Sequence, residues 1–386
     1  MGINWRYIDE ENVDASYGLA VDEFIMSNSE KNTFDATLRL YSYKNYSALC
    51  GRFQDMNAEI NIESCKSNGF QYGRRLTGGG AIIMGEQQLG ICLATHTSKF
   101  NFQHSRELYR NFSEPVINVL RDLEITAGFR AKNDLEVNGK KIAGLGIYID
   151  ELGGLQFHCS LLLDLDIREM LKVLNIPIQK YSDKKLIQSI EERITTINRE
   201  SRYTVDIREL KKRIKESFST RFETSFITQP ISQFERDSIA GIEQLRYLND
   251  EWNFQRSPQK DMTGMSLLKT EFGLLRTYVG LKGENIKSVL ITGDFLDSGN
   301  ELNKIESELK WSLVDKKKID AVVSRNIKSG NTNFDPGSIS EAIWTAAQRA
   351  MAANRYTYKG SCYYPAENTI EKIEATGLNE INNDTI

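Results

Sequence analysis

The sequence predicts an α+β protein of two or three domains. It has 386 residues, and a typical domain has about 150 residues. With 40% hydrophobic and 26% charged residues, its composition is that of a globular chain and not of a disordered or coiled-coil one. Stretches with apolar residues at helical spacing are interspersed with short stretches of alternating apolar and polar residues, which indicates helices mixed with hairpins.

Helical spacing of apolar residues predicts a first helix with Asp14 as its N-cap and a second one that Asn57 begins and Gly69 ends. A third helical stretch is expected to break at Pro115. The predicted helical stretches are 15–26, 57–68, 105–124, most of 167–222, 300–313 and 339–353.

Alternation of apolar and polar residues predicts two short strands joined at Lys44-Asn45, and further strands along the first 300 residues. Asn138-Gly139 is a strong signal for a tight hairpin between two of them. Residues 81–84 and 89–96 are expected to pair as another hairpin, and residues 223–245 to form a polar link. The predicted strands lie within 37–51, 81–84, 89–96, 135–137, 141–149, 155–163, 265–270, 274–281 and 286–292.

Charge and cysteine content exclude several classes of protein. The formal net charge of -4 argues against binding nucleic acid through bulk positive charge. No run of about 18 apolar residues predicts a membrane span, and the first residues do not read as a signal peptide. The 5 cysteines are scattered and form no CxxC pair, so neither a disulfide framework nor a zinc site is indicated. We expect a cytoplasmic protein.

A run of three glycines lies between two arginines and an apolar strand, in the segment Arg74-Arg75-Leu76-Thr77-Gly78-Gly79-Gly80-Ala81. Each glycine costs about 1 kcal/mol of backbone entropy in a strand, so the missing side chains must serve a purpose. Close approach of a ligand to bare backbone would serve one, because free N–H groups bind anionic oxygens and Arg75 adds positive charge. The alternative is a flexible turn with two surface arginines.

A second polar cluster lies between residues 133 and 144. Asn133-Asp134 leads into one strand, and Lys141 begins the next strand beside small residues. A lysine at a strand end can reach a bound carboxylate or phosphate, and its compact charge can stabilise the negative charge that develops in acyl transfer. Alternatively, a lysine after Asn-Gly is a solvated turn residue.

These motifs resemble, in order and approximate spacing, those of lipoate-protein ligases. The matching segments are Ala20-Val21-Asp22-Glu23, Gly51-Arg52-Phe53-Gln54, the glycine-rich segment, Asn133-Asp134-Leu135, Lys141-Ile142-Ala143-Gly144, Phe157-His158-Cys159-Ser160 and Ser189-Ile190-Glu191-Glu192-Arg193-Ile194. Residues 246 to about 315 also resemble the accessory domain of the two-domain ligases. The resemblance covers roughly the first four-fifths of the chain.

The resemblance implies an α+β protein whose catalytic domain, residues 1–240, has the biotin/lipoate-ligase fold, a mixed β-sheet flanked by helices. It further implies a small α+β accessory domain at 246–328, followed by a C-terminal helix and tail at 329–386. Because the accessory domain has no chemical motif of its own, we expect it to move between the two steps of the reaction. No role is predicted for the tail, which includes Cys362.

The activity implied by the resemblance is ATP-dependent lipoylation. Lipoate and Mg²⁺-ATP would give lipoyl-AMP and pyrophosphate, and the lipoyl group would pass to a lysine of a lipoyl domain or an H-type protein. Lys141 would be the catalytic residue and would bridge carbonyl and phosphate oxygens. No metal-binding residue is predicted. The residues expected to bind lipoyl-AMP are Arg75, Thr77, Gly78, Gly79, Gly80, Ala81, Asn133, Asp134 and His158.

Departures from the family pattern leave other activities open. Lys141 to Ile147 also resembles octanoyltransferases, which need no ATP but require a cysteine nucleophile. Cys159 could be that nucleophile, although neighbouring strand residues point to opposite faces, which works against a couple with His158. Met84-Gly85 stands where ligases usually have His-Asp, which suggests a non-catalytic binder of lipoyl domains as a third possibility. A biotin-specific ligase is a weaker fourth.

Overall fold

The computed structural model describes residues 3–30, 34–100, 105–129, 133–175, 188, 190–270, 273–296, 300–327 and 334–355. The chain divides into two compact units. The first consists of Met1–Ser257 and Asp294–Asp297, and the second of Pro258–Gly293 and Ser298–Ile386. Among the described helices, none combines the length and the apolar character needed to cross a bilayer.

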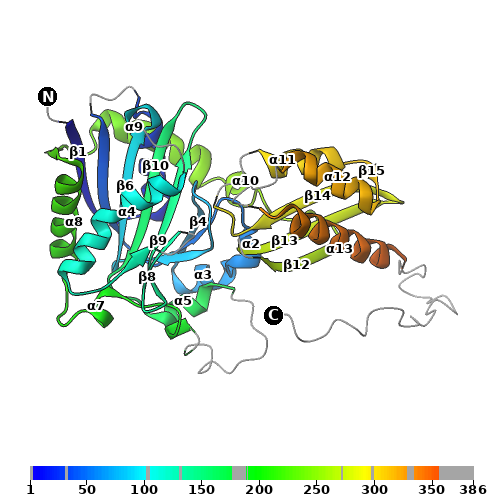
Figure 1. The fold of residues 1–386 in the computed structure, drawn as a ribbon, viewed down its shortest axis with the longest axis horizontal. Coiled ribbons are helices and arrows are strands. Elements are labelled where there is room, and N and C mark those ends of the chain that lie inside the picture. The colour runs from blue at the N-terminus through cyan, green and yellow to red at the C-terminus, as the bar shows by residue number, and fades with distance from the viewer. Residues whose placement is uncertain are drawn as a thin grey trace. The chain divides into compact units, whose positions relative to one another are not determined.

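A mixed sheet forms the centre of the first unit (Figure 1). Its described part has eight strands in the order β11-β1-β2-β6-β10-β9-β8-β7. β1 is parallel to β11 and β2, whereas the other neighbours are antiparallel. In chain order the strands are β1 (Ile3–Val13), β2 (Ala36–Tyr43), β6 (Gln88–His96), β7 (Gly128–Phe129), β8 (Asp134–Val137), β9 (Lys140–Ile149), β10 (Gly154–Leu162) and β11 (Thr224–Thr228).

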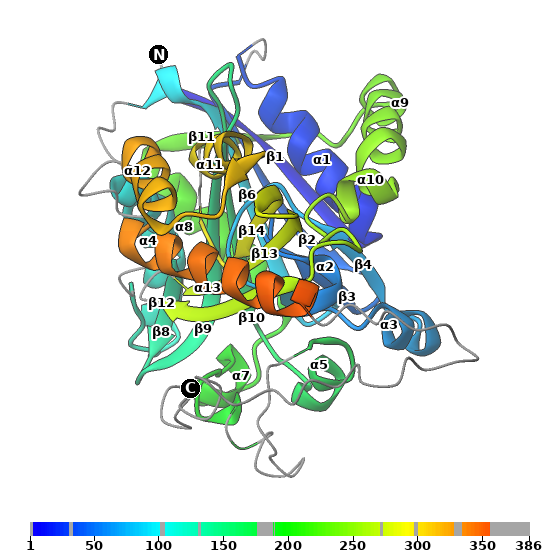
Figure 2. The same cartoon turned by 90° about the vertical axis from the view of Figure 1, so that its right-hand side faces the viewer.

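Helices cover both faces of this sheet (Figure 2), which confirms the predicted mixed sheet flanked by helices. α1 (Ala15–Ser27) and α9 (Gln233–Ile242) pack on one face, and α4 (Ser105–Asp122) and α8 (Ile207–Phe222) on the other. Because side chains alternate along a strand, each central strand contributes to two different layers. On β10, Phe157, Cys159 and Leu161 belong to the core under α4 and α8.

Shorter elements extend the edge of the first unit. β3 (Ser47–Cys50) lies between β4 (Gln71–Arg74) and β5 (Ile82–Met84) in a separate three-stranded sheet. The remaining described helices of this unit are α2 (Met56–Glu59), α3 (Ile62–Asn68), the 3₁₀ helix η1 (Thr97–Lys99), α5 (Ile167–Val173), α7 (Ile197–Glu200), the π-helical turn η2 (Glu243–Tyr247) and α10 (Asp250–Asn253).

The second unit is an antiparallel sheet with helices packed against it, so the predicted α+β module is confirmed. The strands are β12 (Gly264–Thr270), β13 (Gly273–Lys282), β14 (Asn285–Gly293) and β15 (Ser312–Leu313), in that order across the sheet. The helices are α11 (Glu301–Leu309), α12 (Lys316–Asn326) and α13 (Pro336–Arg355), and α13 packs on β12 and β13. Residues 356–386, including Cys362, lie outside the described residues.

The predicted Asn138-Gly139 hairpin is confirmed. Asn138 and Gly139 have φ values of 51° and 79°, and they join the antiparallel strands β8 and β9. Positive φ at both central residues is what a tight two-residue turn with the native strand twist requires, and asparagine and glycine adopt it with little strain.

Two predictions about local structure are wrong. β5 pairs with β3, whereas β6 lies between β2 and β10, so residues 81–84 and 89–96 do not form a hairpin with each other. Both strands are mostly buried, so their apolar sequences do not show which neighbouring strands they pair with. The stretch 57–68 is two helices, capped by the side chains of Asp55 and Asn61 and not by Asn57, although Gly69 ends the second as predicted.

Two longer segments also differ from the prediction. α4 continues through Pro115, because its apolar stripe, with Phe112 and Val116 fully buried, packs against the sheet and α8 on both sides of the proline. This packing outweighs a cost of about 3 kcal/mol for an interior proline. Residues 223–245 are not a polar link, because they form β11, α9 and the start of η2.

α9 is fixed to the sheet by Arg6, which is almost fully buried and donates hydrogen bonds to both Glu235 carboxylate oxygens at 2.5 and 2.9 Å. Burial raises the pKa of Glu235, but hydrogen bonds from Arg6 and Ser232 outweigh it and lower the pKa from 4.5 to about 2. A lowered pKa in the folded state contributes stability that is present above pH 4.5 and is lost as the pH falls towards 2.

Glu235→Gln is therefore expected to lower the free energy of unfolding by about 2 kcal/mol at neutral pH, because it leaves a buried guanidinium without its counter-charge. The deficit relative to the wild type should shrink as the pH falls from about 4.5 towards 2, where Glu235 of the wild type also becomes neutral. Urea unfolding at several pH values measures both effects. Asp237→Asn, on the exposed side of the same helix, is the control and should change stability by less than about 0.5 kcal/mol. A deficit that is constant with pH would contradict the ion-pair explanation.

Candidate functional site

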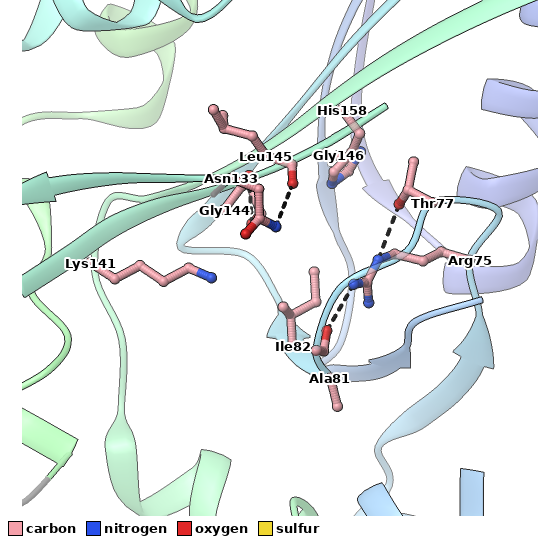
Figure 3. A pocket seen from close by; sticks show the side chains of 12 residues that line it. Arg75, Thr77, Ala81, Ile82, Asn133, Lys141, Gly144, Leu145, Gly146 and His158 are labelled. Carbon is pink, nitrogen blue, oxygen red and sulfur yellow. Dashed lines mark hydrogen bonds between the residues drawn. The ribbon is translucent and has the colours of Figure 1, made fainter. Parts of the chain in front are cut away.

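A small pocket of about 60 Å³ lies in the first unit, between the glycine-rich segment and the strands β9 and β10. Figure 3 shows the Lys141 amine and the Arg75 guanidinium reaching towards the space from opposite sides. The lining residues are Arg75, Thr77, Gly80, Ala81, Ile82, Asn133, Lys141, Gly144, Leu145, Gly146, His158 and Ser160.

The floor of the pocket is made by two pairs of residues on neighbouring strands. Gly144 and Gly146 of β9 stand opposite Ser160 and His158 of β10. A Cβ atom on Gly144 would lie 3.0 Å from the Lys141 amine, and one on Gly146 would lie 2.9 Å from the Thr77 side chain. The two glycines therefore make room for the polar groups around the pocket.

Lys141 is held at the pocket mouth by its backbone and by a carboxylate. Its N–H donates to the Arg193 carbonyl at 2.8 Å, and its own carbonyl accepts from the Thr195 N–H at 2.9 Å. Its side chain is 30% exposed, and Nζ lies 2.8 Å from Asp134 Oδ1. A ligand phosphate or carboxylate would therefore compete with Asp134 for the ammonium group.

The Arg75 guanidinium organises the glycine-rich segment from inside. Nη2 donates to the Gly78 and Gly80 carbonyls at 2.8 Å each, Nη1 to the Leu49 carbonyl and Nε to Thr77 Oγ1. Burial lowers the pKa of Arg75 to about 10, so the group stays charged at neutral pH. All its nitrogens already bind protein oxygens. Arg75 would therefore stabilise a bound anion by its positive charge and by holding the glycine-rich segment in place, and not by donating a hydrogen bond to the anion.

The three glycines meet different needs. A Cβ on Gly78 would lie 2.1 Å from the Phe295 carbonyl oxygen, and Gly79 has φ of 90° and donates its N–H to the same oxygen at 2.7 Å. Backbone packing against Phe295 therefore requires glycine at both positions, and neither lines the pocket. Only Gly80 does so, and a Cβ there would find its nearest atoms, in the Asp294 carboxylate, at 3.9 Å. The expected approach of a ligand to bare backbone is thus limited to Gly80.

Arg74 and Arg75 are both buried, so the alternative of a flexible turn with two surface arginines is wrong. Arg74 Nη1 donates to three backbone carbonyls of residues 51–54, and Nε and Nη2 donate to the Asn253 carbonyl. Arg74 therefore cross-links the loop after β3 to α10 and has a structural role that the sequence did not reveal.

Other predicted residues lie in or beside the pocket. The Asn133 side-chain amide donates to the Leu145 carbonyl at 3.0 Å, and the backbone carbonyl of Asn133 accepts from the Leu145 N–H, which ties the start of β8 to β9. Ala81 and His158 line the pocket, while Asp134 contacts it through Lys141. Met84, the residue that departs from the ligase pattern, is fully buried in the core beneath α1.

Cys159 points away from the pocket. It is fully buried in the core under α4 and α8, whereas its neighbours His158 and Ser160 face the pocket. Burial raises the pKa of the Cys159 thiol well above its usual value. A buried thiol of raised pKa is a poor nucleophile, and the structure gives it no access to a ligand beside Lys141.

Sequence reasoning missed five lining residues, which are Ile82, Gly144, Leu145, Gly146 and Ser160. Some of them were predictable from strand alternation, because residues two apart on a strand point to the same face. Ser160 therefore shares a face with His158, and Gly146 shares one with Gly144. Among the described residues, no group of three or more His, Cys, Asp or Glu side chains could hold a metal ion.

Comparison with known proteins adds independent information. Residues 14–219 match the family model for the lipoyl protein ligase A/B catalytic domain. The lipoate-protein ligase LplJ of Bacillus subtilis is 25% identical over 337 residues, which cover 87% of this chain and 97% of LplJ. The octanoyltransferase LipM of the same organism is also 25% identical, but over 65% of this chain and 98% of its own length.

Among solved structures, LipL1 of P. falciparum, determined in complex with lipoate, has a similar fold. It superposes with a TM-score of 0.67 and 17% identity, over 87% of this chain and 97% of LipL1. This likeness in fold agrees with the predicted fold class.

Proposed function

The chain belongs to the lipoyl protein ligase A/B catalytic-domain family, and on this basis we propose that it is an ATP-dependent lipoate-protein ligase. Enzymes of this family include both lipoate ligases and octanoyltransferases. The lining of the pocket is the main observation that favours the ligase. The pocket carries cationic groups, Lys141 and Arg75, and no cysteine is among the described residues that line it.

Two further observations favour the ligase. LplJ matches 87% of the chain, whereas LipM matches 65% of it although nearly all of LipM is aligned. The extra length is consistent with the second unit being the accessory domain of a two-domain ligase, and the first unit the catalytic domain. In addition, the four cysteines in the described residues are all buried, so none is poised as a nucleophile.

In the adenylation step, a lipoate carboxylate oxygen would attack the α-phosphate of ATP, and pyrophosphate would leave. The Lys141 ammonium would exchange Asp134 for the ligand oxygens and neutralise the charge that develops on the phosphate. Arg75, Thr77, the backbone of Gly80 and Ala81, and Asn133 would surround the acyl-adenylate. The buried pocket would shelter this reactive anhydride from water.

In the transfer step, a lysine amine of a lipoyl domain or an H-type acceptor would attack the carbonyl carbon and release AMP. Mg²⁺ would enter with ATP and be held largely by its phosphates, as is usual for this ion, and we assign no protein ligand to it. The buried free cysteines are consistent with a reducing cytoplasmic location.

Replacing Cys159 tests the proposal against the octanoyltransferase alternative. Cys159→Ala keeps the core apolar, so lipoate-dependent ATP–pyrophosphate exchange and lipoylation of an acceptor domain should stay within about threefold of wild type. The measurement is made with lipoate plus ATP and, separately, with an octanoyl thioester without ATP. Thioester-dependent transfer that disappears in Cys159→Ala would establish the alternative instead.

A further inference from the structure

The two ring nitrogens of His158 lie in different surroundings. The side chain is 7% exposed and lines the pocket, and its Nε2 is buried with no hydrogen-bond partner among the described residues. Nδ1 lies 3.5 Å from the Tyr41 hydroxyl and 3.9 Å from Asp22 Oδ2. A buried polar atom without a partner costs free energy, so the free Nε2 requires an explanation.

Asp22 is the centre of a buried polar network behind His158. Its Oδ1 accepts a hydrogen bond from Arg39 Nη1 at 2.6 Å, and its Oδ2 accepts one from the Tyr41 hydroxyl at 2.9 Å. Arg39 is fully buried and also donates to Glu10 at 2.7 Å. Burial by itself raises the pKa of Asp22, but the Arg39 guanidinium outweighs it and holds the pKa below its usual value. Asp22 is therefore an ionised group that only accepts hydrogen bonds.

The donors and acceptors of this network determine where the His158 proton lies. The hydroxyl of Tyr41 has one hydrogen, and Asp22 accepts it. The Tyr41 oxygen can then only accept from His158, so Nδ1 must carry a proton. In neutral imidazole the other nitrogen is a bare acceptor. The network thus presents the Nε2 lone pair to the pocket.

We propose that His158 Nε2 accepts the proton of the amine that attacks the acyl-adenylate, and that Asp22, Tyr41 and Arg39 are positioning residues that fix its tautomer. This role rests on the proposed ligase function. Lys141 and Arg75, the other ionisable residues among the described pocket lining, are donors only. The acyl and phosphate groups offer only acceptors, whereas the incoming amine is a donor that must lose a proton. The unprotonated Nε2 of His158 is an acceptor in the same pocket as Lys141 and Arg75, so it can receive the proton that the amine loses.

The proposed step balances. The amine nitrogen forms a bond to the acyl carbon, the bond from that carbon to the phosphate oxygen breaks, and AMP leaves with the electron pair. The proton released from nitrogen moves to His158 Nε2 and then to solvent. Proton acceptance by a positioned histidine contributes about 10²-fold to 10⁴-fold to rate.

Nitrogen NMR of the full chain tests the tautomer directly, and His96 is an internal reference of the opposite kind. His96 Nε2 lies 2.8 Å from the Leu152 carbonyl and must donate to it, while Nδ1 accepts from the Ser98 N–H. Among the signals of neutral imidazoles, His158 is expected to give those of a protonated Nδ1 and His96 those of a protonated Nε2. His158→Gln identifies the His158 signals. A protonated Nε2 in wild-type His158 would overturn the proposal.

Variants of the network test the positioning role. In Asp22→Asn, and in Tyr41→Phe should the first variant fail to fold, the preference of His158 for a protonated Nδ1 should be lost. Single-turnover transfer from synthetic lipoyl-adenylate to a lipoyl domain should fall on the order of 10-fold or more, as when a histidine loses its orienting carboxylate. A network with a purely structural role would leave the tautomer and the folded variant's transfer rate unchanged.

The two half-reactions separate proton acceptance from substrate binding. His158→Gln should slow transfer by about 10²-fold or more while pyrophosphate release from lipoate and ATP changes by less than about threefold. His96→Gln, outside the pocket, should change neither. Equal losses in both half-reactions, or unchanged transfer, would overturn the assignment. If the wild type forms no adenylate but transfers from the synthetic one, the proposed ligase function fails while the role of His158 stands.

Discussion

Replacing Lys141 with alanine is expected to lower lipoate-dependent ATP–pyrophosphate exchange on the order of 10² or more, because the charge that acts mainly on the transition state is removed. The loss should appear in kcat more than in KM for ATP. Lys141 is positioned for this role by backbone hydrogen bonds to Arg193 and Thr195, which do not involve its side chain. The variant should therefore fold normally.

The matched control is Lys140→Ala, which removes the same charge one residue earlier on β9 from a side chain outside the pocket lining. Its exchange activity should stay within about twofold of wild type, since a half-buried charge outside the pocket lining does not act on the bound substrate. Equal losses in the two variants would mean that net charge, and not the placement of the Lys141 amine, determines the rate.

A methyl group on Gly51 should disrupt the site without touching a ligand. The Cβ of Gly51→Ala would lie 1.9 Å from the Gly79 carbonyl oxygen and 3.4 Å from Arg75 Nη2. The glycine-rich segment must then move, and the Arg75 hydrogen bonds to Gly78 and Gly80 must break or lengthen. We expect a loss of at least about 3 kcal/mol in the free energy of unfolding and little adenylation activity.

Gly73→Ala is the control for this variant. Gly73 is buried on the adjacent strand β4, but a Cβ there would find its nearest atoms, both of leucine side chains, at 3.7 and 4.0 Å. The free energy of unfolding should stay the same or rise by about 0.5 kcal/mol, because alanine lowers the conformational entropy of the unfolded chain. Thermal unfolding and pyrophosphate exchange measure both variants. If Gly51→Ala and Gly73→Ala had the same stability and the same exchange activity, the glycine-rich segment would tolerate displacement, contrary to this prediction.

Features decided by local chemistry were predictable from the sequence. The Asn138-Gly139 turn fixes the β8–β9 hairpin by its own backbone preferences, and strand alternation correctly separated His158 from Cys159. Asp14 lies at the predicted N-cap of α1, yet its side chain makes no cap hydrogen bond and accepts instead from Gln71. The residue type of Asp14 correctly predicted where the helix begins. Its carboxylate, however, binds the Gln71 side chain and not the backbone of α1.

Features decided by distant partners were not predictable. The run of glycines was attributed to a ligand, whereas Gly78 and Gly79 are required by the Phe295 backbone, more than 200 residues further along the chain. Arg74 was not recognised as buried, because its partners at Gly51 and Asn253 adjoin it only after folding. The Asp22–Arg39 ion pair could not be predicted either, because it joins α1 to β2 and forms only when these elements pack together.

The return of the chain to the first unit at Asp294–Asp297 means that one cut cannot separate the two units cleanly. A polypeptide ending at Ser257 would lack the Phe295 oxygen that accepts the Gly79 N–H, and the Asp294 carboxylate that accepts the Gln54 amide. Truncation would thus disturb the glycine-rich side of the pocket even though every residue lining the pocket remained. An excised first unit needs these four residues restored, for instance by circular permutation, before its activity can be compared with that of the full chain.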